Sequence, residues 1–360
     1  MVFPGLLCHI LAMAPIPRRS ALAGLATMLG MSTSSCIPPR FLWGANLKEM
    51  PSAPYGSDGC ARLMEELAGI GLSEVAPVFF LWQPDPAAPL PQPGGSDPSR
   101  LGQAVRQARR AGLAPWPKAH LWIPGHWAGA ARPPDPEAWL SGLSRLLLPH
   151  AEAAERNGAA GFVIGTELVG LEGSESWREV AWAVRRVFSG KLSYAAHGVE
   201  GLGRFRAWDA LDEVLVSAWP PLGDDPSPAG MAPRVAAELR AVRTVAPPGR
   251  SVSLAEVGMR SKHGAQAEPW RSPEETQGPP DEALQARAIA VWDGEARKAG
   301  MARAWWWCVY SDPEAGGVRD TDFTPQGKLG WRVLEQAARG RRPDLGGRLG
   351  TPSPPPGALP

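Results

Sequence analysis

Short apolar segments alternate with amphipathic segments along most of this 360-residue chain. The apolar segments have the length and composition of buried strands, and the segments between them place apolar residues at helical spacing. The predicted strands are residues 41–47, 75–82, 114–123, 161–164, 191–195, 213–218, 251–257 and 302–310. The predicted helices are residues 61–70, 101–111, 136–157, 175–188, 199–211, 235–245, 281–299 and 328–338. Eight strand–helix units favour one α/β domain, a (β/α)8 TIM barrel over residues 37–339, rather than a doubly wound sheet.

The long loops of this pattern share one position relative to the strands. The Pro- and Gly-rich segments 83–99, 220–233 and 258–280 each follow a predicted strand and precede a predicted helix. In a TIM barrel such loops gather at the C-terminal face, where the sites of these folds lie. We therefore expect the functional site at the C-terminal ends of the strands.

Two carboxylates end predicted strands. Glu167 follows the apolar run that starts at Phe162, and Glu256 ends the segment SVSLAE. We expect these strands, the fourth and the seventh, to face each other across the barrel mouth. Glycoside hydrolysis needs such a pair, one carboxyl group to donate a proton and one carboxylate to attack, and a separation of about 5–5.5 Å predicts retention of configuration. Either glutamate alone is as well explained by an arginine partner or a helix cap, so the pair carries the interpretation.

Charge and residue spacing argue against several other classes of protein. The net charge is +1, and no basic stripe, helix-turn-helix or zinc-finger spacing points to nucleic acid. The six histidines form no metal-binding group, and an acid–base glycosidase needs no metal or other cofactor, so we expect none. The 16 tryptophans either stack on sugar rings or fill the core. Cys60 and Cys308 either form a pair or are simply buried.

The first 36 residues have the layout of a targeting segment. Arg18 and Arg19 precede an apolar run, residues 21–31, that is too short to span a bilayer, and small residues follow. The arginine pair resembles part of a twin-arginine signal, and the residues before Cys36 resemble part of a lipobox. Lipid attachment at Cys36 and simple cleavage nearby both fit. We expect an exported protein, either periplasmic, extracellular or anchored to the membrane by lipid.

Both ends of the chain extend beyond the predicted domain. Residues 1–12 are apolar and uncharged, a poor start to an export signal, so Met13 is a candidate for the true start. Residues 340–360 are rich in Pro, Gly and Arg and have no apolar period, which predicts disorder.

Three short motifs carry a more specific resemblance. They are GTEL at residues 165–168, EVGMRS at residues 256–261 and FTPQGK at residues 323–328. In this order they resemble clan A of the glycoside hydrolases and, within it, family 113, whose characterised members are mainly β-mannanases. The likeness extends more weakly over roughly residues 40–338.

The resemblance implies roles for single residues. Glu167 matches the general acid/base of the family and Glu256 its nucleophile. Thr166 occupies the position where many clan A enzymes have an asparagine that binds the sugar 2-hydroxyl group, and family 113 also has threonine there. Lys118 and His120 match a Lys-Pro-His pattern in which Ala119 replaces proline.

Other strand ends combine one family match with departures from the pattern. Trp307 matches the tryptophan that serves as a sugar platform throughout the clan. Tyr194 is followed by Ala-Ala-His197, where the family commonly has Ser-Ala-Asn. Trp219-Pro220-Pro221 replaces a Tyr-Tyr-Pro-like segment. These departures fall where substrate would bind.

The candidate substrate contacts are side chains at or near strand ends. They are Lys118, His120, Trp127, Thr166, Tyr194, His197, Trp219 and Trp307. The two histidines either bind sugar hydroxyl groups or are satisfied core residues. Of Trp122, Trp127 and Trp219 we expect one to be a sugar platform. Lys118 either positions substrate or pairs with a carboxylate.

The sequence therefore predicts an exported, monomeric, retaining glycoside hydrolase that acts on a β-linked polysaccharide or oligosaccharide, most simply a β-mannan. Two alternatives stay open. One is a carbohydrate-binding TIM-barrel lipoprotein of the cell envelope without catalytic activity. The other is a glycosidase of a different envelope glycan.

Overall fold

Parallel strands close into a barrel in the computed structural model, which describes residues 41–341 and 343. The barrel strands hydrogen-bond in the order β1-β10-β9-β8-β7-β6-β5-β2, and pairing between β1 and β2 closes the ring. Their bounds are β1 (Leu42–Lys48), β2 (Glu74–Trp82), β5 (Lys118–Trp122), β6 (Gly161–Thr166), β7 (Lys191–His197), β8 (Val214–Ser217), β9 (Val252–Gly258) and β10 (Arg303–Tyr310). The predicted (β/α)8 TIM barrel is confirmed.

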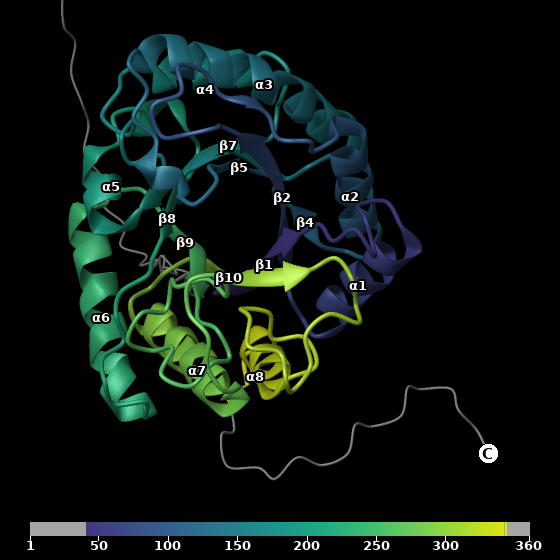
Figure 1. Cartoon of the computed structure of the whole chain (residues 1–360), viewed down its shortest axis with the longest axis vertical. Helices are drawn as coiled ribbons and strands as arrows, with labels where there is room; N and C mark the ends of the chain where they lie inside the picture. The colour runs from purple at the N-terminus through teal and green to yellow at the C-terminus, as the bar shows by residue number, and fades with distance from the viewer. Residues whose placement is uncertain (1–40, 342, 344–360) are drawn as a thin grey trace, which may run out of the picture. The chain divides into compact units, whose positions relative to one another are not determined.

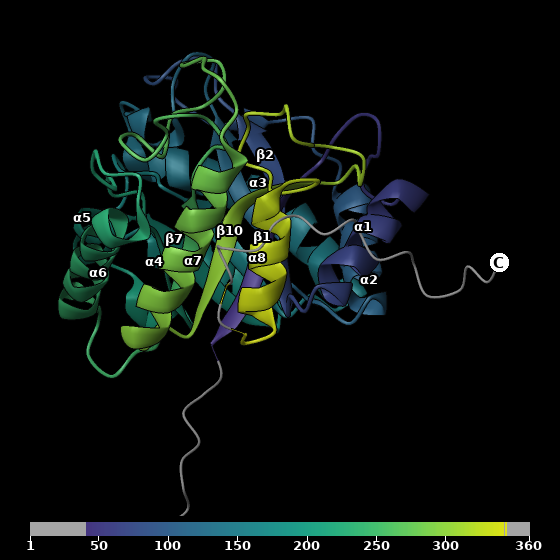
Figure 2. The same cartoon turned by 90° about the horizontal axis from the view of Figure 1, so that it is seen from below.

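Helices surround the strands on the outside of the barrel (Figure 1). Their bounds are α1 (Asp58–Gly69), α2 (Pro98–Arg110), α3 (Pro136–Asn157), α4 (Trp177–Arg185), α5 (Gly198–Arg204), α6 (Pro228–Val245), α7 (Glu282–Lys298) and α8 (Leu329–Ala338). The short elements are β3 (Gln92–Pro93), β4 (Ala114–Pro115) and the 3-10 helices η1 (Ala128–Ala130) and η2 (Trp208–Ala210). The long loops gather at the upper end of the barrel in Figure 2.

Local sequence explains where the longest helix begins and ends. The Asp135 side chain accepts hydrogen bonds from the backbone amides of Glu137, at 3.1 Å, and Ala138, at 3.0 Å. Pro136 occupies the first helical position, where its missing N–H is not needed. Gly158 ends the helix with φ at 75°, a left-handed conformation that glycine adopts without strain. The predicted bounds of this helix, residues 136–157, are confirmed.

The third predicted strand, residues 114–123, is not continuous. It is split into β4 and β5, with Trp116 and Pro117 between them. Pro117 has no N–H to donate to a neighbouring strand, so the ladder is interrupted there. The prediction of one unbroken strand was therefore wrong.

The sixth helix begins earlier than its apolar period suggests. We expected a loop as far as Pro233, but α6 begins at Pro228. The Ser227 hydroxyl caps this end by accepting from the backbone amide of Gly230 at 3.1 Å, and Pro228 fits the first helical position. Cap residues rather than apolar spacing determine this boundary.

Aromatic and small side chains fill the barrel interior. This inner core contains Ala76, Trp116, Val163, Ala195, Leu215, Ala255 and Trp305. The two indole rings lie 5.7 Å apart, and alanines on neighbouring strands leave the space that they occupy. Near the starts of the strands, Arg303 contacts Glu74 at 2.8 Å and also pairs with Glu213. The N-terminal end of the barrel is therefore packed, and polar chemistry is left to the C-terminal end.

Several predictions concern residues outside this description. The predicted targeting segment, with Cys36, and residues 344–360 of the predicted tail lie outside the described residues. Within the described part, Cys60 and Cys308 are free and buried, so they do not pair. No helix in that part is long and apolar enough to cross a bilayer.

Candidate active site

Glu167 and Glu256 lie at the C-terminal ends of two barrel strands. Glu167 directly follows β6, and Glu256 is the third-last residue of β9. Strands β7 and β8 separate them on one side and four strands separate them on the other, so they lie nearly, but not fully, opposite. Both side chains are largely removed from water, since Glu167 is 8% exposed and Glu256 is 3% exposed. Each carboxyl group therefore responds strongly to its neighbours.

Lys118, from the start of β5, is the charged partner of Glu256. Its ammonium group donates to a Glu256 carboxylate oxygen and, at 2.9 Å, to the side-chain oxygen of Asn46. Asn46 in turn donates to the Ala255 carbonyl at 3.0 Å. Burial lowers the pKa of Lys118, and the attraction of Glu256 opposes this. A fully buried positive charge thus lies against one of the two carboxylates.

Glu167 has a different environment. Burial raises the pKa of Glu167, and the negative charge of Glu256 raises it further. A hydrogen bond from His197, with Nδ1 lying 2.9 Å from Glu167 Oε1, acts in the opposite direction. The two carboxyl groups are therefore unequal, which is the condition for one to act as an acid while the other acts as a base or nucleophile.

His197 and Trp127 form the open side of the site next to Glu167. Burial alone would lower the pKa of His197, but Glu167, Glu172 and Glu256 together raise it above its ordinary value. The Trp127 ring lies 4.7 Å from the His197 ring, and Trp127 is 49% exposed. An exposed indole beside a buried acid is suited to stack against a sugar ring.

His120 and Trp307 lie on the side of Glu256. His120 Nε2 is 3.8 Å from Glu256 Oε1. The centres of the His120 and Trp307 rings are 5.6 Å apart. Burial is the main cause that lowers the pKa of His120 to about 4, so this imidazole is neutral at pH 7. The ammonium group of Lys118 lies 5.3 Å from the centre of the Trp307 ring. The structure therefore brings together Lys118, His120, Glu256 and Trp307.

Trp219 reaches the same region because a glycine leaves room for it. A Cβ atom at Gly258 would lie 2.6 Å from the Trp307 carbonyl oxygen and 2.8 Å from the Trp219 ring. The Trp219 ring also meets Phe323 edge-on at 5.9 Å. Trp219 is half-buried, so one part of the ring packs and another part faces solvent.

Three of the candidate substrate contacts are buried. The Thr166 hydroxyl donates to the Ala119 carbonyl at 2.9 Å, and Lys118 donates to Glu256. The Tyr194 hydroxyl accepts from the Leu168 amide at 2.8 Å, and none of its side chain is exposed. Glu167 and Glu256 are buried as well, so contact of Thr166 and Tyr194 with substrate stays a prediction. Lys118 pairs with a carboxylate, which is one of its two expected roles.

Two residues of the site were missed in the sequence. Glu172 is a fully buried carboxylate in the loop after β6, and Asn46 links Lys118 to β9. Asn46 is a polar residue within an apolar strand, which is a signal that the sequence itself contains. Glu172 has no such signal, because it lies in an irregular loop.

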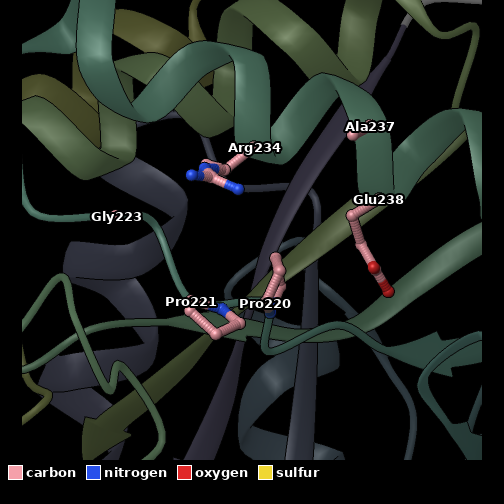
Figure 3. Close-up of a pocket in the computed structure, with 6 residues that line it drawn as sticks. All are labelled: Pro220, Pro221, Gly223, Arg234, Ala237 and Glu238. Carbon is pink, nitrogen blue, oxygen red and sulfur yellow. The ribbon is translucent and has the colours of Figure 1, made fainter.

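A separate pocket of about 420 Å³ lies beside this region (Figure 3). Arg234 and Glu238 project from α6 toward the loop that carries Pro220 and Pro221. The two carboxylates and the candidate substrate contacts do not line this pocket, but Pro220 and Pro221, which follow Trp219, do. Within residues 41–341 and 343, no group of three or more His, Cys, Asp or Glu side chains is arranged to hold a metal ion.

Solved structures that resemble the chain are glycosidase barrels. A GH113 β-1,4-mannanase complex gives a TM-score of 0.72 at 19% identity, covering 82% of this chain and 98% of that chain. The GH113 β-mannanase AaManA from Alicyclobacillus acidocaldarius, in complex with ManMIm, gives 0.70 at 22% identity, covering 82% and 96%. GH5_18 from Streptomyces cattleya, in complex with GlcNAc, gives 0.52 at 16% identity, covering 83% and 80%. These likenesses establish the fold.

Family membership comes from the sequence match. No curated protein sequence matches the chain. The model of Glycoside Hydrolase Family 113, however, matches residues 118–328, which is more than half of the 360 residues. The matched range includes Lys118, Glu167 and Glu256. The chain therefore belongs to glycoside hydrolase family 113 and is a glycosidase with a carbohydrate substrate.

Proposed function

We propose that this protein is a retaining glycoside hydrolase of β-linked, mannan-like polysaccharide or oligosaccharide, with Glu167 as acid/base and Glu256 as nucleophile. The observation that carries the proposal is the unequal environment of the two carboxyl groups. Lys118 places a positive charge against Glu256, and burial raises the pKa of Glu167. An attacking carboxylate needs the first environment and a proton donor needs the second.

The reaction proceeds in two balanced steps. In the first, a Glu256 oxygen bonds to the anomeric carbon while the glycosidic C–O bond breaks, and the Glu167 proton moves to the leaving oxygen. In the second, Glu167 takes a proton from water, the water oxygen bonds to the anomeric carbon, and the bond to Glu256 breaks. Two inversions at the same carbon retain its configuration. Both carboxyl groups return to their starting protonation states.

The side chains around the carboxyl groups suit a sugar substrate. Trp127 is half-exposed, and Trp219 and Trp307 are partly exposed, so each offers an apolar face to a pyranose ring. His120 and His197 supply polar groups beside Glu256 and Glu167. The two β-mannanase neighbours support mannan as the substrate. His197 and Trp219, which depart from the family pattern, favour a different envelope glycan as the second candidate.

A substrate panel with product analysis tests this function. The purified barrel domain is incubated with β-mannan, glucomannan, cellulose, xylan and peptidoglycan, and proton NMR follows the anomer of the first product. We expect hydrolysis of mannan and initial release of the β-anomer. Initial release of the α-anomer would refute retention. Binding of a glycan without hydrolysis of any would favour the non-catalytic alternative.

We also propose that the enzyme acts outside the cytoplasm, as a monomer. The support is the sequence of residues 13–36, in which an arginine pair, a short apolar run and small residues before Cys36 follow one another. Cys36 is then either lipidated or removed with the signal.

The alkaline limb of the pH–rate profile is expected to depend on His197. Glu167 must be protonated in the first step, so kcat/KM falls as pH rises through its pKa, which burial places above the ordinary glutamate value. The His197 hydrogen bond and charge lower this pKa, because they favour ionised Glu167. Replacing His197 by alanine should therefore move the alkaline limb to higher pH.

The matched control is His263→Ala. His263 is an exposed histidine whose Nδ1 lies 3.8 Å from Asp281 Oδ2 rather than near Glu167. Its removal should leave the limb unchanged. A limb that stays in place or moves to lower pH in His197→Ala would contradict the assigned role.

A further inference from the structure

Glu172 is a buried carboxylate that the reaction itself does not use. It lies in the loop after β6, and none of its side chain is exposed. Its Oε1 atom accepts from the backbone amide of His197 at 3.0 Å and from the Tyr194 hydroxyl at 3.3 Å. The other oxygen, Oε2, is buried without a hydrogen-bond partner. Burial raises the pKa of Glu172, so the site is unfavourable for its charge.

The contacts of Glu172 lead to the two residues that define the acid side of the site. His197, whose backbone amide it binds, contacts Glu167 through its imidazole at 2.9 Å. Tyr194, its other donor, accepts from the amide of Leu168, which directly follows Glu167. Glu172 Oε1 thus binds the backbone of His197 directly. Through the Tyr194 hydroxyl group it is also linked to the backbone amide of Leu168, the residue after Glu167.

The backbone at Glu167 needs this support. Its φ angle is 53°, and no other non-glycine residue that the structure describes has a positive φ. Such a conformation is strained and persists only where surrounding contacts impose it. Two hydrogen bonds to β7 residues do so here, since the Glu167 amide donates to the Ala195 carbonyl at 2.9 Å and the Leu168 amide donates to Tyr194 at 2.8 Å.

Packing leaves no room for Glu172 to move toward α5. A Cβ atom at Gly201, in that helix, would lie 2.5 Å from Glu172 Oε1. The helix backbone therefore presses directly against the carboxylate, and Tyr194 stacks on Phe205 at 4.4 Å on the same side. An apolar side chain of similar size would fill this space without the desolvation cost of a buried charge. The carboxylate is therefore better explained by what it holds than by stability.

We propose that Glu172 is a positioning residue for the acid/base, which sets the geometry of both Glu167 and His197 without touching substrate. This inference rests on the proposed role of Glu167. It predicts a defect confined to proton donation. Such a defect is visible in the dependence of the rate on the leaving group, because a poor leaving group needs the proton and a good one does not.

The test compares phenyl β-mannobioside with 2,4-dinitrophenyl β-mannobioside as substrates of the Glu172→Ala protein. We expect kcat/KM for the phenyl substrate to fall between about 10-fold and 100-fold, as for a misplaced catalytic group, and the dinitrophenyl substrate to lose less than about threefold. Glu172→Gln keeps an acceptor oxygen for His197 and Tyr194, so it should restore most of the loss. Equal losses on both substrates would overturn the proposal.

Two further variants keep the test decisive. Tyr194→Phe keeps the ring that stacks on Phe205 and removes the hydroxyl group that joins Glu172 to the Leu168 amide, so it should reproduce the phenyl-selective loss if Glu172→Ala does not fold. Glu238→Gln is the matched control. Glu238 interacts with His197 only through space from the pocket in Figure 3, so both substrates should keep their rates. An equal phenyl-selective loss in Glu238→Gln would overturn the specific role of Glu172.

Glu167→Ala separates this inference from the proposed function. If Glu167→Ala shows no selective loss on the phenyl substrate, the assignment of the acid/base fails. If Glu167→Ala shows the selective loss and Glu172→Ala does not, only the positioning role fails.

Discussion

Replacing Glu256 by alanine is expected to lower kcat by at least about 10⁴-fold on every substrate, whatever its leaving group. The variant has no carboxylate to bond to the anomeric carbon, so the first step loses its covalent route. Hydrolysis of a dinitrophenyl glycoside, followed by absorbance, measures the loss. Added azide should partly restore the reaction and give a glycosyl azide of inverted configuration, because a small anion can enter the space that the side chain leaves.

The control for this variant must separate chemistry from folding. Removal of Glu256 leaves the buried Lys118 without its charged partner, and breaking a buried ion pair in this way costs about 3–5 kcal/mol of stability. Glu256→Gln retains a polar partner for Lys118 and also lacks the nucleophile, so it should be inactive yet more stable. Glu268→Ala changes an exposed glutamate that pairs with Arg271 and should behave like the unmodified protein. Activity close to that of the unmodified enzyme in Glu256→Ala or Glu256→Gln would refute the assignment.

Replacing Glu167 by alanine is expected to lower kcat/KM by about 10²–10⁴-fold on substrates with poor leaving groups. The reason is that the leaving oxygen then departs as an anion, without the proton that Glu167 supplies. Dinitrophenyl glycosides should react in the first step almost as well as before and then accumulate the glycosyl-enzyme, because water lacks its base. A pre-steady-state burst of dinitrophenol measures this directly.

Azide distinguishes this variant from the loss of the nucleophile. It should speed the second step of Glu167→Ala and give a glycosyl azide of retained configuration, since azide needs no base. A uniform loss on good and poor leaving groups alike would contradict an acid/base role for Glu167.

The sequence was sufficient to predict the barrel and the placement of the two carboxylates in it. Strand and helix periods are local, so eight units are visible without any knowledge of tertiary contacts. A glutamate at the end of a buried strand must emerge at the C-terminal end of a barrel. The errors came from single residues, such as Pro117, which splits a strand, and Ser227, which caps α6 eight residues before the apolar period begins.

The sequence was not sufficient to predict what each side chain at a strand end touches. Lys118, Thr166 and Tyr194 were candidates for substrate contact, and in the structure all three are buried and hydrogen-bonded within the protein. A strand end can point toward the cleft or into packed neighbours, and the loops and helices that cover it decide which. Glu172 was missed for the same reason, because its importance comes from His197 and Tyr194 and not from its own neighbours in the chain.

The sequence by itself therefore determined the fold, the face of the barrel that carries the site, and the family. Each of these depends on patterns within a few residues or on short motifs. Only the tertiary structure decided the surroundings of the two carboxyl groups. Lys118 and Glu256 are 138 positions apart, and Glu167 and His197 are 30 apart, so closure of the barrel brings each pair together. Burial raises the pKa of Glu167, and Lys118 places a positive charge against Glu256, so two identical side chains have different surroundings. The proposed roles of acid/base and nucleophile rest on this difference.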